Sequence, residues 1–426
     1  MRLINKNLFS IAPIIPARLI MKAFFFIVLF LNASLLFPCC GQIENQKKPE
    51  NIHFDSLHIY FNDSTLIGDK KYNNIVFSYL RNRTLELLAS DSSYKKIDNQ
   101  WNTARMKIAL ELFTDSVVKN YWLHSIAYNQ IDNYGIKNTE KILNLFYNNC
   151  TNQAYISEIK KMYEADAELR KGYKITVYKT VDGFNLDAHI FYPPNFNQKE
   201  KLPAILFFHG GSWYEGKVDW MFGACKKYAE LGMAAIAIEY RLYDRHGAPP
   251  YECISDAKSA VRWIRSNANE LGINPDKIIA YGFSAGGHLV ACTAMLKILD
   301  APGEDTTVSA VPNAMIFISS CFDPTLDKWF VKQVEKLYPP KSCSPIHNIR
   351  KGLPQSIIIH AANDRMCPFW TAEKFSEEMV KVGNNNKLVR IEEAGHFFIF
   401  EKQYREKVDN AINEFLTSLG YILNTK

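Results

Sequence analysis

The sequence lacks several features that would place it in a large class of proteins. No cluster of basic residues interleaved with aromatic ones occurs, so no nucleic-acid partner is predicted. It has no internal repeat and no low-complexity tract, which excludes repeat architectures and biased linkers. The apolar run at residues 23–37 is too short to span a membrane comfortably.

Metal-binding cysteine patterns are also missing. Seven of the nine cysteines follow residue 40, and their spacing does not resemble that of a zinc site. Because seven is odd, at least one thiol stays unpaired even if export oxidises the others.

Charge does not point to a partner either. The formal net charge is +6, but residues 1–39 contain four basic residues and no acidic one, so they contribute most of it. Apolar residues make up 47% and charged residues 22% of the chain, which is ordinary for a globular protein with a sizeable core. A length of 426 residues allows two or three domains.

The N-terminal end has the pattern of a secretory signal. A positive start at residues 21–22 precedes the apolar run, and the methionine there is itself a candidate start. Cys39 and Cys40 end the run and resemble a bacterial lipoprotein cleavage site; an ordinary cleaved signal is the alternative. We predict residues 1–40 as signal peptide and 41–52 as tether of an exported protein, periplasmic or outer-membrane. Its membrane contact would be only through an N-terminal lipid anchor.

Residues 53–168 are predicted to form a helical N-terminal region. Apolar residues recur there at helical spacing on one face, as in Met106, Ala109, Phe113 and Val117. The aromatic residues of this region are expected to belong to a core, and no residue pattern in it points to a chemistry. A role in interaction or in substrate access stays open.

From residue 169 onwards the hydrophobic period changes to that of strands. The predicted strands are 175–180, 186–191, 204–208, 233–238, 278–281, 314–318, 356–359 and 388–391. They are separated by helical stretches near 217–231, 256–271, 288–299, 370–382 and 402–418. Residues 169–426 are therefore predicted to form an α/β domain, with a mostly parallel sheet and helices on both faces.

A serine lies between one of these strands and the next helix. Gly282-Phe283-Ser284-Ala285-Gly286 fits the pattern G-x-S-x-G. This strand-to-helix turn raises its serine above the sheet and crowds the backbone, which requires glycine on both sides. The first N–H groups of the helix carry partial positive charge where an oxyanion would form. Ser284 is therefore the predicted nucleophile.

A glycine pair follows strand 204–208. His209 ends the strand, and Gly210 and Gly211 come next. Glycines at this place let a ligand approach backbone N–H groups, so both are predicted to form an oxyanion hole together with the N–H of Ala285. His209 is predicted to hold the loop and not to react.

Two later loops supply an acid and a base. Asp364 and His396 each follow a predicted strand. Serine is a poor nucleophile until a neutral imidazole accepts its proton, and a carboxylate must orient that imidazole. We predict Asp364 as the acid and His396 as the base. Glu392 and Glu393 are rival acids, but they lie too close in sequence to His396 to approach its ring easily.

Residues 174–420 resemble the α/β-hydrolase fold in its esterase and lipase branch. The order Ser284, Asp364, His396 is that of the fold, and the H-G-G and G-x-S-A-G-G motifs are those of the branch. This branch includes hormone-sensitive-lipase-like carboxylesterases and the bacterial acetyl-xylan and feruloyl esterases. Further similarity lies at 239–247, 251–263 and 344–354. The resemblance implies a Ser284–His396–Asp364 triad with an oxyanion hole of Gly210, Gly211 and Ala285.

The resemblance also implies the activity and its requirements. We expect a serine esterase without metal or organic cofactor, acting on a small-molecule or carbohydrate ester with a short acyl group such as acetyl. Phe397 and Phe398 replace the glycine often found there and would narrow the pocket, Cys367 replaces a common valine, and the short segment 322–343 predicts a small lid. Two alternatives stay open. One is a serine peptidase of prolyl-oligopeptidase type, which usually carries a β-propeller; the other is a non-catalytic surface binding protein.

Overall fold

The computed structural model of the protein describes residues 59–96 and 98–422. The predicted signal peptide, tether and lipidation cysteines lie outside the described residues. Within the described part of the chain, no helix combines the length and the apolar character needed to cross a membrane.

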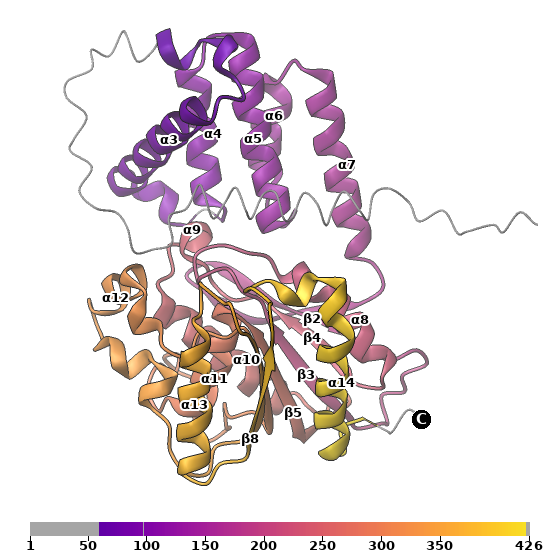
Figure 1. Ribbon diagram of the computed structural model, residues 1–426. Helices are drawn as coiled ribbons and strands as arrows, with labels where there is room; N and C mark the ends of the chain where they lie inside the picture. The colour runs from indigo at the N-terminus through magenta and orange to yellow at the C-terminus, as the bar shows by residue number, and fades with distance from the viewer. Residues whose placement is uncertain (1–58, 97, 423–426) are drawn as a thin grey trace, which may run out of the picture. The chain divides into compact units, whose positions relative to one another are not determined.

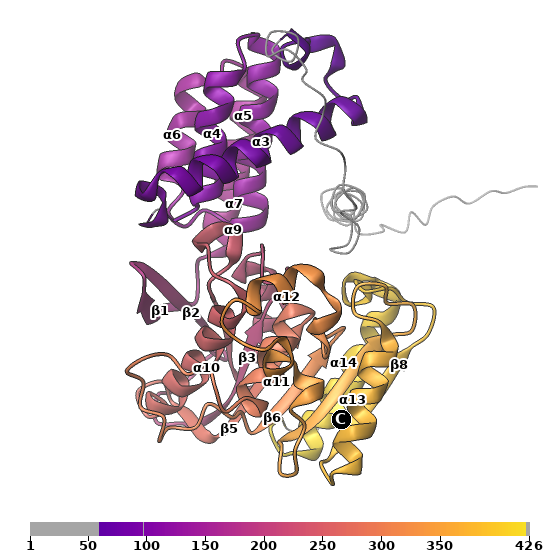
Figure 2. The same cartoon turned by 90° about the vertical axis from the view of Figure 1, so that its left-hand side faces the viewer.

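Successive helices form the first part of the described chain: α3 (Lys70–Ser90), α4 (Gln100–Leu112), α5 (Ser116–Tyr134), α6 (Glu140–Asn149) and α7 (Gln153–Leu169). Three of them begin at a side-chain cap, because Asp69, Asp115 and Asn152 each accept an N–H from the first turn. Figures 1 and 2 show α4, α5 and α6 lying side by side. Their shared core contains buried aromatic rings such as Phe113 and Phe146, as predicted for this region.

An eight-stranded sheet follows, in the order β1-β2-β4-β3-β5-β6-β7-β8. Its strands are β1 (Lys174–Val181), β2 (Phe184–Phe191), β3 (Leu202–Phe208), β4 (Ala234–Ile238), β5 (Ile273–Phe283), β6 (Ala314–Ile318), β7 (Gln355–Ala361) and β8 (Asn386–Ile391). The first two run antiparallel to their neighbours, and β4 to β8 form a parallel sheet with β3 between β4 and β5. β1 and β8 lie at opposite edges (Figure 2). β4 and β6 are fully buried, and β3 is buried from Ala204 to Phe208, which explains why their sequences are apolar without alternation.

Helices cover both faces of the sheet (Figure 1). One face packs against α10 (Pro250–Ser266), α11 (Ala285–Met295) and α13 (Phe369–Lys381), and the other against α8 (Phe222–Glu230) and α14 (Lys402–Ser418). Two short helices, α9 (Tyr243–His246) and α12 (Lys328–Val334), lie in connecting segments. The predicted fold class, an α/β-hydrolase sheet preceded by a helical region, is thereby confirmed.

Two helix boundaries differ from those predicted. α10 begins at Pro250 and not near residue 256, because proline is well suited to the first helical position, where its missing N–H is not needed. α11 begins at Ala285, directly after the serine, and not at residue 288. The second difference matters for the site, because it places the helix N-terminus against Ser284.

Candidate active site

Ser284 occupies a strained turn between β5 and α11. Its φ of 54° lies in the left-handed region, which costs a non-glycine residue on the order of 1–3 kcal/mol. The neighbouring glycines are required sterically, since a Cβ on Gly282 would lie 2.3 Å from the Gly286 carbonyl oxygen. A Cβ on Gly286 would lie 2.1 Å from the carbonyl oxygen of Phe208. The turn thus packs directly onto the end of β3.

The three residues predicted as nucleophile, base and acid lie within hydrogen-bond distance of one another. Nε2 of His396 is 3.0 Å from Oγ of Ser284, and its Nδ1 is 2.7 Å from Oδ2 of Asp364. All three side chains are at least nine-tenths buried. They come from the segments that follow β5, β7 and β8. Because these strands are parallel, their carboxyl ends all lie at the same end of the sheet.

The rival acids do not reach His396. The carboxylate of Glu392 pairs with Arg390 at 3.0 Å, and both side chains are more than half exposed. Glu393 is an exposed residue with a φ of 57°. Of the three candidate acids, Asp364 is therefore the one that lies within hydrogen-bond distance of the histidine.

Asp364 is held as a carboxylate by its neighbours. Burial raises its pKa, but the imidazoles of His360 and His396 outweigh burial, so the pKa lies well below its usual range. Its Oδ1 also accepts the backbone N–H groups of Met366 and Cys367, at 2.9 and 2.8 Å. A charged, fixed carboxylate is what the orienting role requires.

Sequence analysis did not single out His360 for this site. Its Nε2 lies 2.7 Å from the carbonyl oxygen of Cys367 and 3.4 Å from Asp364. The available signal was a histidine inside the otherwise apolar strand β7, four residues before the acid. A buried histidine in such a strand needs polar partners, and these are found in the acid loop.

Gly210, one of the two glycines of the predicted oxyanion hole, lies next to Ser284. A Cβ on Gly210 would lie 3.1 Å from Cβ of Ser284, so this residue borders the nucleophile. Among the residues that the structure describes, neither glycine's N–H donates to another group. Ala285 is the first residue of α11, so its N–H has no partner inside the helix.

His209 holds the loop without facing the reaction. Its Nδ1 lies 2.6 Å from the carbonyl oxygen of Gly210, and its ring stacks on Tyr240 at 4.4 Å. The Tyr240 hydroxyl donates to the carbonyl oxygen of His209 at 2.8 Å. Burial lowers the pKa of His209 to about 4, so its ring is neutral near pH 7.

Aromatic rings pack around His396. Phe283 packs against the His396 ring at 5.3 Å, and Phe400 contacts Phe283 at 5.7 Å. Phe397 lies edge-on to His396 at 5.0 Å. Phe283 is 6% exposed and Phe400 is 46% exposed, so of these two rings only Phe400 presents much apolar surface to solvent.

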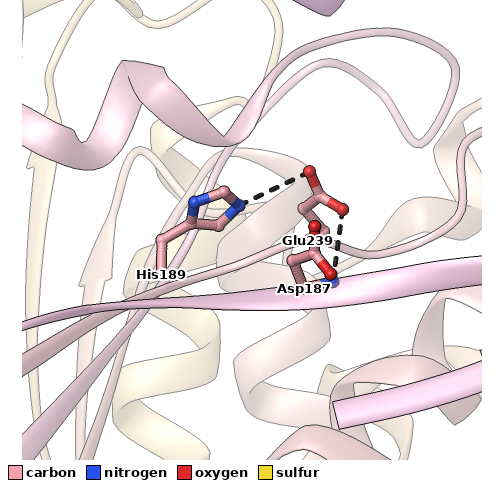
Figure 3. Close-up of side chains that lie close together, drawn as sticks. All are labelled: Asp187, His189 and Glu239. Carbon is pink, nitrogen blue, oxygen red and sulfur yellow. Dashed lines mark hydrogen bonds and ion pairs between the residues drawn. The ribbon is translucent and has the colours of Figure 1, made fainter. Parts of the chain in front are cut away.

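One cluster among the described residues has the composition of a metal site. Asp187, His189 and Glu239 bring ligand atoms within 4.8 Å of one another (Figure 3). However, the ammonium group of Lys137 already lies 2.7 Å from the Asp187 carboxylate and 2.6 Å from that of Glu239. A cation thus fills the place between the two carboxylates, and we interpret the cluster as an ion-pair anchor for the helical region.

Comparison with known proteins identifies the family to which the chain belongs. Residues 188–379 match the model of the BD-FAE family. Esterase 2 of Thermogutta terrifontis, in its apo form, is 38% identical; the match covers 60% of this chain and 98% of that one, with a TM-score of 0.57. The chain belongs to the α/β-hydrolase esterases, and its residues 188–379 are similar to the BD-FAE family.

More distant curated relatives are esterases too. Esterase LipC of Mycobacterium tuberculosis is 26% identical over 46% of this chain and 53% of its own length. Carboxylesterase NlhH of the same species is 32% identical over 34% of this chain and 44% of its own length. The chain thus spans about half the length of these two relatives. The helical region lies outside the part that matches the BD-FAE family.

Proposed function

We propose that the protein is a serine carboxylic-ester hydrolase. The observation that carries this proposal is the continuous hydrogen-bonded series from Ser284 through His396 to Asp364, beside free backbone N–H groups. Family membership among esterases supports the same conclusion.

This geometry supports a two-step reaction. Ser284 Oγ attacks the ester carbonyl carbon while His396 Nε2 accepts the serine proton, and Asp364 stabilises the imidazolium. The N–H groups of Gly210, Gly211 and Ala285 stabilise the oxyanion, and each such donor typically contributes about 3–4 kcal/mol. His396 then protonates the leaving alcohol. In the second step it activates water, which releases the acid and restores the serine.

The proposed substrate is a small or carbohydrate ester with a short acyl chain. Structures of the Thermogutta esterase hold propionate and butyrate. The BD-FAE family takes its name from bifunctional acetyl-xylan and feruloyl esterases. The half-exposed Phe400 ring, which packs on Phe283 beside His396, suits the hydrocarbon part of such an acid.

The decisive experiment compares residues 41–426 with their Ser284→Ala variant. We expect hydrolysis of p-nitrophenyl acetate and butyrate, less with octanoate, and none in the variant. Paraoxon, which phosphorylates the Thermogutta esterase, should add one diethylphosphoryl group that peptide mass spectrometry locates on Ser284. A folded wild-type protein that hydrolyses none of the esters and takes up no label would refute the proposal. Acetylated xylan is the next substrate to assay.

No observation favours the peptidase alternative. The prolyl-oligopeptidase type would call for a β-propeller, whereas the described residues before β1 form helices α3 to α7. A non-catalytic binding role would not require the hydrogen-bonded arrangement of Ser284, His396 and Asp364.

We further propose export with an N-terminal lipid, a proposal that rests on the sequence pattern alone. Labelled palmitate should enter the full-length protein in a bacterial host and not a variant in which both Cys39 and Cys40 are serine. Equal labelling of the two proteins, or of neither, would contradict lipidation at these residues.

A further inference from the structure

The oxyanion loop, residues 209–216, is supported from the helical region. Both belong to one compact unit of residues 46–426. Tyr134, the last residue of α5, is 5% exposed, and its hydroxyl donates a hydrogen bond to the Asp244 carboxylate at the start of α9. The Asp244 N–H in turn donates to the carbonyl oxygen of Tyr214 at 3.1 Å. A series of hydrogen bonds thus connects α5 to the oxyanion loop.

The loop needs external support because its backbone is strained. Ser212 and Trp213 have φ values of 54° and 59°, in the left-handed region that non-glycine residues rarely adopt. Such conformations persist only where the surroundings impose them. The N–H groups of Tyr214 and Glu215 both donate to the carbonyl oxygen of Gly211, each at 3.0 Å. A displacement of Tyr214 would therefore move Gly211, whose N–H is a proposed oxyanion donor.

Ion pairs hold the helical region in the position that the Tyr134–Asp244 hydrogen bond requires. The ammonium group of Lys137, three residues after Tyr134, lies 2.7 Å from the carboxylate of Asp187 and 2.6 Å from that of Glu239, which directly follows β4. Figure 3 shows these two acidic residues beside His189. Asp98 accepts from Arg245, the neighbour of Asp244, at 2.7 Å. All of these acceptors and donors are largely buried, so screening by solvent is weak.

We propose that Tyr134 is a positioning residue for ester hydrolysis, acting through Asp244 on the loop that carries Gly210 and Gly211. This inference rests on the proposed function. Tyr134 lies outside the part of the chain that matches the BD-FAE family, so the helical region would supply this chain with a catalytic support of its own.

The test compares Tyr134→Phe with Tyr72→Phe in the full chain. The control is closely matched, because Tyr72 is also a fully buried tyrosine of the helical region and its hydroxyl donates to the Phe61 carbonyl oxygen at 2.8 Å, away from the sheet. Each variant loses one hydroxyl and one buried hydrogen bond. Four quantities are measured: kcat and KM for p-nitrophenyl acetate, the rate of phosphorylation by paraoxon, the unfolding midpoint, and hydrogen exchange of a peptide spanning 205–216.

We expect kcat and the paraoxon rate of Tyr134→Phe to fall about 10- to 100-fold with KM changed less than threefold, because a small misplacement of catalytic groups has effects of that size. Exchange of the loop peptide should quicken in this variant alone. Both variants should lose similar stability. Equal kinetics and equal loop exchange in the two variants would overturn the proposal.

Hydrogen exchange also separates the two hypotheses. A wild-type protein without esterase activity would refute the proposed function, while faster loop exchange in Tyr134→Phe would still establish that Tyr134 holds the loop. Active wild-type protein together with unchanged kcat in Tyr134→Phe would refute the positioning role and leave the proposed function intact.

Discussion

Asp364 uses both carboxylate oxygens, one toward His396 and one toward backbone N–H groups. Asparagine at this position would offer an NH₂ to Nδ1 and favour the wrong histidine tautomer. We therefore expect Asp364→Asn to lower kcat about 10⁴-fold with little change in KM. Assays with p-nitrophenyl acetate at pH 8 check this. Glu393→Gln is the control and should stay near wild type; a comparable loss in that variant would contradict the assignment of the acid.

Glu215 makes the stability depend on pH near neutrality. Burial raises its pKa from 4.5 to about 7, against the lowering effect of Arg105. The neighbouring acidic groups do not lower this pKa. Burial raises the pKa of Asp244, and Glu215 adds to that increase; burial also raises the pKa of Tyr134. Between pH 4.5 and 7 the folded state thus binds more protons than the unfolded state, and its stability falls as pH rises.

This shift in the pKa of Glu215 corresponds to a loss of about 3 kcal/mol in the free energy of unfolding between pH 4.5 and 8. We expect Glu215→Gln to reduce the pH dependence by about that amount when urea unfolding is measured across the range, while the raised pKa values of Asp244 and Asp219 keep their own contributions. Glu168→Gln is the control, since Glu168 is 71% exposed and paired only with Lys171. A Glu215→Gln profile parallel to that of wild type would mean that this carboxyl does not cause the effect.

At the scale of elements, the junction of β3, β5 and α11 depends on glycine. Gly286→Ala would push a methyl group into the backbone oxygens of Phe208 and His209, which cannot move without breaking the sheet. We expect a loss of at least about 2 kcal/mol in unfolding free energy together with lost activity. Gly223 in α8 is exposed and its Cβ would meet nothing within 4 Å. Gly223→Ala should therefore stabilise by about 0.5–1 kcal/mol. Equal effects of the two substitutions would contradict this account.

Elements were predictable where a local pattern decides them. The apolar strands from 204 to 391 and the turn at Ser284 follow from runs of buried residues and from the glycines around them, so the sheet and the order of the triad residues could be predicted. Contacts between distant segments could not. Tyr134 and Asp244 are 110 positions apart, and a lone tyrosine at a helix end carries no sign of its acceptor. His360 was missed for a different reason. Its partners Asp364 and Cys367 lie only four and seven positions further along the chain, but the sequence does not show that this loop folds back onto the end of β7.

For the whole molecule, the ion pairs of Lys137 decide whether the helical region is an integral part of the enzyme. The side chains of Lys137, Asp187 and Glu239 are each less than one-fifth exposed. Burial raises the pKa of Glu239, but His189 and Lys137 more than offset it, so this carboxyl stays charged. Lys137→Met would leave two buried carboxylates without their cation. Removal of one partner from a buried ion pair typically costs about 3–5 kcal/mol.

We therefore expect Lys137→Met to lower the unfolding free energy by roughly that 3–5 kcal/mol, measured by urea titration at pH 7.5. Lys171→Met is the matched control, because Lys171 pairs with Glu168 on the surface, both 71% exposed, and such pairs contribute at most about 1 kcal/mol. A loss no larger than that of the control, at any pH, would show that these ion pairs do not join the helical region to the sheet. In that case the hydrogen bond of Tyr134 would have to hold the oxyanion loop without their support.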